Sequence, residues 1–311
     1  MADIIPLINQ HALTAADLQH MTFPPLRSVI PGFLTEGTTV LAGKPKLGKS
    51  WLGMDWCISV AIGGCALGKI ECEQGDVLYA ALEDNPRRLQ RRLRQVIPDR
   101  QAWPDRLTLR TSMKRIDEGL LDELRAWANA SENPRLIVID TLAKVRPPAK
   151  RSDNPYEADY RAVSPFTDLA AELQLAILIV HHTRKMDADD PLDMVSGTTG
   201  LTGGVDSVMV LTRDGQGTIL TGRGRDLDDF ESAVKLDSSG RWTLLGDADE
   251  VRRSKERNCI LAAVERLGEA GPKEIADASG LKESNVKVLV GKMAEAGELE
   301  KVERGRYRLP S

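Results

Sequence analysis

The sequence has no long apolar run. No segment approaches the roughly 18 uninterrupted apolar residues that a membrane-spanning helix needs, and 28% of the 311 residues are charged. The N-terminus also lacks the basic segment and long apolar stretch that together mark a secretion signal. We therefore expect a cytoplasmic protein that does not partner with a membrane.

Cysteine and histidine are scarce, with four residues of each. Cys57, Cys65, Cys72 and Cys259 show no C-x-x-C spacing and do not pair with the histidines. This argues against a zinc site and against a disulfide framework. We interpret the cysteines as reduced and structural.

The formal net charge is only -4, but it is unevenly distributed. Residues 1–250 carry 29 basic and 36 acidic side chains, whereas residues 251–311 carry 13 and 10. The C-terminal part is thus mildly basic on an acidic body. Overall charge says little about fold, and this asymmetry is weak support for a nucleic-acid contact.

Short apolar runs alternate with amphipathic segments from about residue 38 onward. This pattern predicts an α/β domain with a mostly parallel sheet. Near-continuous apolar runs, as in strands buried on both faces, predict strands at residues 38–42, 77–82, 136–140, 176–181 and 207–212. The expected helices comprise residues 50–62, 85–96, 119–130 and 155–173. Short polar strands after residue 215 predict an antiparallel extension of the sheet.

A second, smaller domain is predicted at the C-terminus. Residues 247–255 are charged and poor in apolar side chains, which favours a linker. Beyond it we expect helices at residues 256–268, 272–279 and 283–296, followed by a β-hairpin around Arg304 and Gly305. Three helices and a hairpin are typical of a winged helix-turn-helix domain. The predicted division is an extension (1–23), an α/β domain (24–246), a linker (247–255) and the small domain (256–311).

The clearest motif is a complete G-x-x-x-x-G-K-[ST] between a predicted strand and a predicted helix. It consists of Gly43, Lys44, Pro45, Lys46, Leu47, Gly48, Lys49 and Ser50, and we assign Trp51 to the same site. Glycines let backbone N–H groups surround phosphate oxygens, and the helix N-terminus adds partial positive charge. The lysine reaches the terminal phosphates and the serine ligates magnesium. The motif predicts binding of ATP with Mg²⁺.

Two further predicted strands end in acidic residues. Asp140 ends the strand at 136–140, at the strand end where ligands of such sheets bind, and we predict that it holds magnesium together with Ser50. Glu83 and Asp84 follow the strand at 77–82. Glu83 is our predicted base for the attacking water. Asp84 is the alternative base, or else the N-cap of the next helix.

Polar residues at two other strand ends are candidates for sensing the nucleotide. His181 and His182 follow the strand at 176–181, and we predict that His182 senses the γ-phosphate, although an ordinary hydrogen-bonded histidine at a strand end remains open. Arg223 and Arg225 end a later strand. In ring-shaped ATPases a neighbouring subunit supplies such an arginine; a solvated surface pair is the equally weighted alternative.

These motifs together resemble the RecA-like ATPases and, more narrowly, the RepA family of plasmid and mobile-element hexameric replicative helicases. The resemblance covers about residues 24–245. It implies a homo-oligomeric ring, in the family a hexamer, that hydrolyses ATP at subunit interfaces and moves along single-stranded DNA. It assigns phosphate and magnesium to Lys49 and Ser50, the base to Glu83, magnesium support to Asp140 and γ-phosphate sensing to His182.

The resemblance is less close in two respects. Arg223 and Arg225 stand where related rings have a Lys-x-Arg pair, which keeps the charge. The family does not require the small C-terminal domain, whose predicted third helix offers Lys282, Lys287 and Lys292 to phosphates but also carries glutamates. We expect this domain to bind duplex DNA or a replication protein.

The resemblance also implies DNA-facing loops at residues 144–156 and 184–199. The first contains Lys144, Arg146, Lys150 and Arg151, which suit a phosphate backbone, although a charged loop without a ligand is an equally ordinary explanation. Two functions are therefore open. One is a DNA helicase or translocase that replicates a plasmid, phage or other mobile element. The other is an ATP-switched regulator or helicase loader without unwinding activity. A strand-exchange recombinase fits less well, because the extended N-terminal region expected of one is missing.

Overall fold

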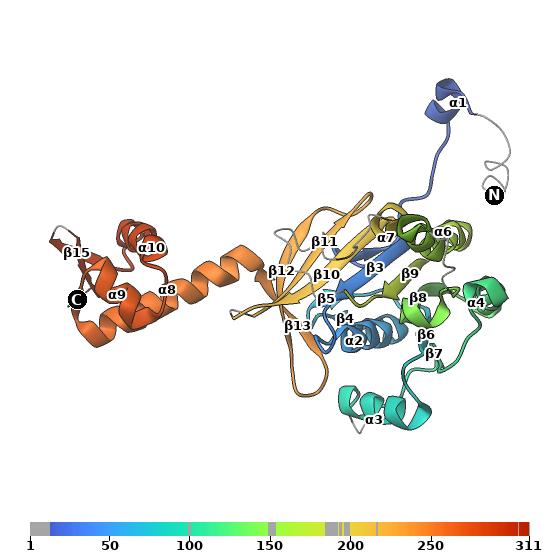
Figure 1. Cartoon of the computed structure of the whole chain (residues 1–311), viewed down its shortest axis with the longest axis horizontal. Helices are drawn as coiled ribbons and strands as arrows, with labels where there is room; N and C mark the ends of the chain where they lie inside the picture. The colour runs from blue at the N-terminus through green and yellow to red at the C-terminus, as the bar shows by residue number, and fades with distance from the viewer. Residues whose placement is uncertain are drawn as a thin grey trace.

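The computed structural model describes residues 13–98, 101–148, 154–183, 192, 195, 200–215, 217–303 and 305–310. Two folded parts are joined by the long helix α8 (Ala248–Leu267), which leaves the larger part at the sheet edge formed by β12 and β13 (Figure 1). No helix within the described ranges is long and apolar enough to cross a membrane.

The larger part is built on a nine-stranded sheet with the order β13-β12-β11-β10-β3-β9-β8-β6-β7. Neighbouring strands from β10 to β7 run parallel, and β11, β12 and β13 extend the sheet in antiparallel fashion. The strands are β3 (Gly37–Gly43), β6 (Asp76–Ala81), β7 (Leu107–Arg110), β8 (Pro134–Asp140), β9 (Ala176–Val180), β10 (Ser207–Arg213), β11 (Thr218–Gly224), β12 (Phe230–Leu236) and β13 (Trp242–Asp247). The predicted α/β architecture with an antiparallel extension is confirmed.

Helices cover both faces of this sheet. On one face lie α2 (Lys49–Ile62) and α3 (Pro86–Val96), and on the other lie α4 (Leu120–Ala130) and α6 (Pro155–Leu173). Strand β8 shows why its run is continuously apolar. Leu136 and Val138 belong to the core under α2, whereas Ile137 and Ile139 belong to the core under α6. Successive side chains of a strand point to opposite faces, so a strand covered on both faces must be apolar throughout.

Short elements complete the larger part. They are the helices α1 (Ala15–Gln19), α5 (Leu142–Val145) and α7 (Gly200–Gly203), the 3₁₀ helix η2 (Ile116–Glu118), and two small hairpins, β1 (Ser28–Ile30) with β2 (Leu34–Thr35) and β4 (Cys65–Ala66) with β5 (Ile70–Glu71). Residues 1–12 of the predicted N-terminal extension lie outside the described residues. The described part of the extension contains α1, which buries no side chain.

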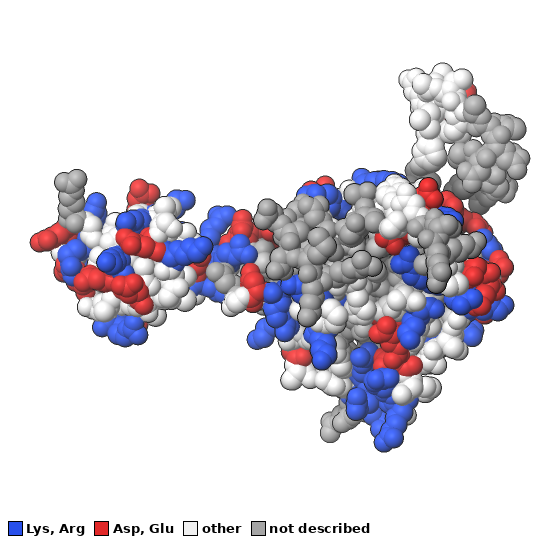
Figure 2. All heavy atoms as spheres, viewed as in Figure 1, with Lys and Arg blue, Asp and Glu red and all other residues white. Residues whose placement is uncertain are grey.

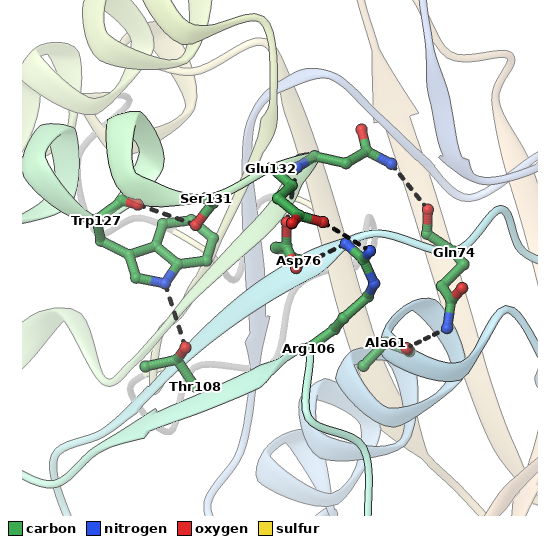
Figure 3. Close-up of polar contacts among 9 residues, drawn as sticks. Ala61, Gln74, Asp76, Arg106, Thr108, Trp127, Ser131 and Glu132 are labelled. Atoms are coloured by element: carbon green, nitrogen blue, oxygen red, sulfur yellow. Dashed lines mark hydrogen bonds and ion pairs between the residues drawn. The ribbon is translucent and has the colours of Figure 1, made fainter.

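A polar network ties the N-terminal ends of three parallel strands together (Figure 3). Arg106, just before β7, bonds to Asp76 at the start of β6 (3.0 Å) and to Glu132 just before β8 (3.1 Å). The Trp127 indole of α4 also donates to the Thr108 hydroxyl on β7 (3.3 Å). These contacts hold the edge strand β7 in register, at the end of the sheet opposite the carboxyl ends of the strands.

The smaller part packs around one apolar core. The second half of α8, α9 (Pro272–Ser279) and α10 (Glu283–Glu295) enclose buried residues that include Ile260, Ile275 and Val290. A three-stranded sheet of order β14-β16-β15 lies against them, formed by β14 (Glu269–Ala270), β16 (Arg306–Arg308) and β15 (Glu300–Glu303). Arg304, at the tip of the predicted hairpin, lies outside the described residues.

Residues 247–255, predicted as a linker, are helical. Asp247 is the N-cap of α8, and its carboxylate accepts hydrogen bonds from the N–H groups of Asp249 and Glu250 (both 3.0 Å). A capping carboxylate satisfies N–H groups that a helix start otherwise leaves unpaired. The segment is charged and free of glycine and proline, so once capped it continues as helix into the predicted helix at 256–268.

Candidate nucleotide-binding and catalytic site

The phosphate-binding loop lies between β3 and α2, as the motif predicts. Gly43 and Gly48 have φ values of +152° and +102°. A Cβ at Gly43 would lie 2.5 Å from the Leu211 carbonyl oxygen, and one at Gly48 would lie 2.8 Å from the Trp242 ring. Both positions therefore require glycine, because the loop packs closely on β10 and β13. Pro45 is exposed at the loop tip.

Lys49 is buried at the first position of α2, and its ammonium group faces into the loop. Its Nζ donates to the carbonyls of Gly43 (2.6 Å) and Lys44 (3.0 Å). Burial lowers the pKa of Lys49 to about 8, although Asp140 and Glu83 act in the opposite direction. A lysine with backbone carbonyls as partners is ready to exchange them for phosphate oxygens, which are stronger acceptors for an ammonium.

Asp140 lies at the carboxyl end of β8 and is also buried. Its Oδ2 accepts a 2.8 Å hydrogen bond from the Tyr79 hydroxyl, while Oδ1 is buried with no hydrogen-bond partner in the described structure. Burial raises the pKa of Asp140, and hydrogen bonds from Ser50 and Tyr79 oppose that rise. A carboxylate oxygen with free acceptor capacity beside a serine hydroxyl fits the oxygen ligands that Mg²⁺ prefers.

Glu83 and Asp84 follow β6 and have different surroundings. The Glu83 carboxylate accepts a hydrogen bond from the Thr141 hydroxyl (3.2 Å) and lies 3.9 Å from His182 Nε2. The Asp84 side chain, only 7% exposed, is paired with Arg88 and Arg92, both at 2.5 Å. Two guanidinium groups neutralise Asp84, so only Glu83 has its carboxylate at the P-loop edge of the sheet with acceptor capacity.

The alternative role of Asp84 as a helix N-cap is wrong. The N-cap of α3 is Asn85, whose side chain accepts a 2.9 Å hydrogen bond from the N–H of Arg88. Pro86 occupies the first helical position, where its missing N–H has no cost. The sequence therefore starts this helix one residue later than an Asp84 cap requires.

The double histidine follows β9, the strand between β3 and β8. The Nδ1 atom of His182 is buried and has no partner among the described residues, and its Nε2 faces Glu83. Burial lowers the pKa of His181 to about 4, so this imidazole is neutral at physiological pH. His182 thus has one ring nitrogen close to the candidate base and one able to change its partner.

The candidate residues converge because their strands are neighbours. Leu41 pairs with Val180, Val180 with Asp140, and Asp140 with Ala81. Parallel strands end at the same edge of the sheet, so segments far apart in the sequence meet at the N-terminus of α2. Lys49, Ser50, Glu83, Asp140 and His182 all lie at this edge.

Three residues of the site are not among the sequence-based candidates. Tyr79 and Thr141 contact the two carboxylates, and Arg92 pairs with Asp84 while lying 5.1 Å above the ring of Trp51. Gly240, in the β12–β13 turn, packs against the same ring. The available signal was Tyr79, the one polar side chain within a buried apolar strand. Trp51 lies between Arg92 and Gly240, so its ring supports the site from outside the phosphate loop.

The arginine pair lies away from this edge. Gly224, between Arg223 and Arg225, pairs with Ser207 of β10, whereas Gly43 pairs with Leu211, four residues further along the same strand. At about 3.3 Å per residue, this separates the two levels by about 13 Å. Arg223 is paired with Asp229 (2.9 Å) and Arg225 contacts Asp206 (3.5 Å). Both arginines therefore face away from the phosphate loop of their own chain.

The predicted DNA-facing loops are only partly described. Lys144 is exposed on α5, and Arg146 is paired with Asp159 (3.0 Å). Lys150 and Arg151 lie outside the described residues, as does the loop at 184–199 apart from Leu192, which is partly exposed, and Val195, which is buried. On α10, Lys287 is paired with Glu283 (2.7 Å), so part of its basic charge is neutralised within the helix.

Comparison with solved structures identifies the fold. One solved ATPase domain superposes on this chain with a TM-score of 0.54 at 13% identity, covering 68% of this chain and 85% of that one. A DnaB-like replicative helicase, whose structure concerns its interactions with primase, gives a TM-score of 0.55 at 13% identity, covering 70% and 62%. A KaiC-like protein from Pyrococcus horikoshii OT3 gives 0.48 at 13% identity, covering 71% and 99%. The fold is that of the RecA-like P-loop NTPases, as predicted from the sequence.

The sequence itself identifies the family. The family model described as "AAA domain" matches residues 6–188, which is more than half of the chain and includes the phosphate loop, Glu83 and Asp140. Lys49 and the buried Asp140 lie where such a domain binds its nucleotide. The chain belongs to the AAA-domain family of P-loop nucleotide-binding proteins.

Proposed function

We propose that this protein is an ATP-hydrolysing, ring-forming DNA translocase or helicase of the RepA type that replicates a plasmid, phage or other mobile element. One observation carries the proposal. The phosphate loop, base and magnesium carboxylate meet at one edge of the sheet, while Arg223 and Arg225 lie about 13 Å away at the level of the opposite edge. These arginines reach a γ-phosphate only in a neighbouring subunit, which favours a closed ring.

Hydrolysis follows from the side chains of the site. Glu83, with its carboxylate free of guanidinium partners among the described residues, orients the attacking water and accepts its proton. Lys49 leaves the carbonyls of Gly43 and Lys44 and binds the terminal phosphates. Ser50 and Asp140 hold Mg²⁺, which supplies positive charge next to the transferred phosphoryl group.

His182 links this chemistry to movement. It lies 3.9 Å from Glu83 and directly precedes the segment 184–199, predicted to face DNA. Loss of the γ-phosphate changes the hydrogen-bond partners available to His182, and that change passes to the following segment. Loop 144–156 begins just after Thr141, which bonds to the same glutamate. Both loops are thereby attached to the hydrolytic centre.

The small C-terminal part is proposed to be a winged helix domain that targets the ring. Its three helices and three-stranded sheet fit that arrangement. On α10, Val288 is 58% exposed next to Lys287, which is paired with Glu283. This exposed surface mixes apolar and charged groups, so we propose a replication protein or duplex DNA as its partner.

The experiment is strand displacement on a forked substrate, with Lys49→Ala as the control. We expect ATP-dependent displacement by the wild-type protein and none by the variant. If the wild-type protein hydrolyses ATP but displaces no strand and does not respond to DNA, the helicase proposal fails and the ATP-switched regulator or loader replaces it.

A further inference from the structure

Helix α3 is unusually basic for an acidic protein. The chain carries a formal charge of -4, yet this helix contains five arginines and no acidic residue. In the space-filling view the basic atoms gather over α3, at the bottom of the molecule (Figure 2). This concentration of one charge sign requires an explanation in terms of a partner, because like charges on one helix repel one another.

The five arginines fall into two groups. Arg88 and Arg92 are bound to Asp84, and they therefore belong to the catalytic end of the helix. Arg87, Arg91 and Arg94 are exposed, and among the described parts of the chain no acidic side chain pairs with them. We call these three residues the α3 arginine face.

The geometry of the α3 arginine face is fixed by the helix. The spacing i, i+4, i+7 places its members on one side, and at 1.5 Å per residue they span about 10 Å. The opposite side is anchored because Leu89, Leu93 and Val96 are buried in the core under α2. The guanidinium groups thus form a short row on a rigid support.

The chemistry of this row selects a phosphate-bearing partner. Guanidinium groups bind phosphate oxygens in a bidentate manner, and all the basic residues here are arginines. No large apolar side chain of α3 is exposed, so a protein partner would find no buried anchor of the kind that supplies most interface energy.

We propose that the α3 arginine face binds the phosphodiester backbone of a nucleic acid, as a contact separate from the loops 144–156 and 184–199. Its position links it to the site. Arg88, on the same helix, donates to the carbonyl oxygen of Glu83 (3.2 Å) and holds Asp84. A strand bound along α3 therefore lies next to the segment that carries the candidate base. The inference rests on the proposed function only for the identity of the partner.

The test is the salt dependence of nucleic-acid binding by the full chain. The variant is Arg87→Gln/Arg91→Gln/Arg94→Gln, which leaves the Asp84 pairs intact. Each phosphate contact contributes about 0.7 to 0.9 to the slope of log affinity against log salt concentration. We expect the slope to fall by roughly 2 and the affinity at low salt to weaken at least tenfold. Fluorescence anisotropy with single-stranded and duplex oligonucleotides identifies which form is bound.

The matched control is Arg27→Gln/Lys69→Gln/Arg110→Gln, which removes the same charge from exposed positions spread over the larger part. Thermal unfolding checks that both variants fold. If the α3 variant and the control show the same slope and affinity, the inference is wrong. That outcome differs from failure of the proposed function, in which the wild-type protein itself binds no nucleic acid.

Discussion

The charge of Lys49 gives the most specific prediction about nucleotide binding. Burial lowers the pKa of this lysine to about 8 in the absence of nucleotide. Bound phosphates favour the ammonium form and raise that pKa again, so binding above pH 8 requires uptake of a proton. The phosphate groups themselves, with a second pKa near 6, are already ionised in this range. The affinity for ATP should therefore fall as the pH rises from 7 to 9.

The size of this effect follows from the pKa. At pH 7 about nine-tenths of a group with a pKa near 8 is protonated, and at pH 9 about one-tenth, so the affinity falls roughly tenfold, or about 1.4 kcal/mol. The assay is equilibrium titration with a fluorescent ATP analogue at several pH values. Lys49→Arg, which stays charged throughout, should bind with a flat pH profile. A wild-type profile that is flat, or that the arginine variant reproduces, would refute the reasoning.

Three other predictions concern the support of the site and the ring. Tyr79→Phe removes a 2.8 Å hydrogen bond to the magnesium carboxylate, so the magnesium concentration for half-maximal hydrolysis should rise roughly tenfold; equal behaviour of Tyr79→Phe and the exposed control Tyr160→Phe would contradict this. Burial raises the pKa of Asp55 from 3.8 to about 6, so its stabilising contribution is present below pH 4 and lost as the pH rises to 6. Denaturant unfolding at pH 4 and pH 7 should show the wild-type protein losing up to roughly 3 kcal/mol relative to Asp55→Asn, and parallel pH profiles would exclude it. Mixing Arg225→Ala with Glu83→Ala subunits should restore part of the hydrolysis in co-assembled rings, whereas no recovery despite confirmed co-assembly would remove the trans role.

The buried strands could be predicted because burial on both faces leaves a plain sequence signal. Strand β8 is apolar at every position from Leu136 to Ile139, and its boundaries follow from that run. Strand β7 could not be predicted in this way. It is an edge strand whose residues Leu107–Arg110 are only partly buried, so polar and apolar side chains mix, and its place depends on Arg106 bonding to distant carboxylates.

The candidate site shows the same division. The phosphate loop is a local motif, and Glu83 and Asp140 end apolar strands, so sequence patterns are enough to find them. Tyr79 bonds to Asp140 across 61 positions of sequence, and no local pattern reports such a distance. The separation of Glu83 from Asp84 likewise required the two ion pairs to Asp84, which depend on how α3 turns back after its cap.

The central claim is that nucleotide hydrolysis drives movement along DNA within a ring. Its most direct test is ATP hydrolysis with and without single-stranded DNA, measured together with the native mass of the assembly. The account predicts a multimer, in the RepA type a hexamer, whose hydrolysis is stimulated by single-stranded DNA and abolished by Lys49→Ala. A monomer that hydrolyses ATP at the same rate with and without DNA would contradict it.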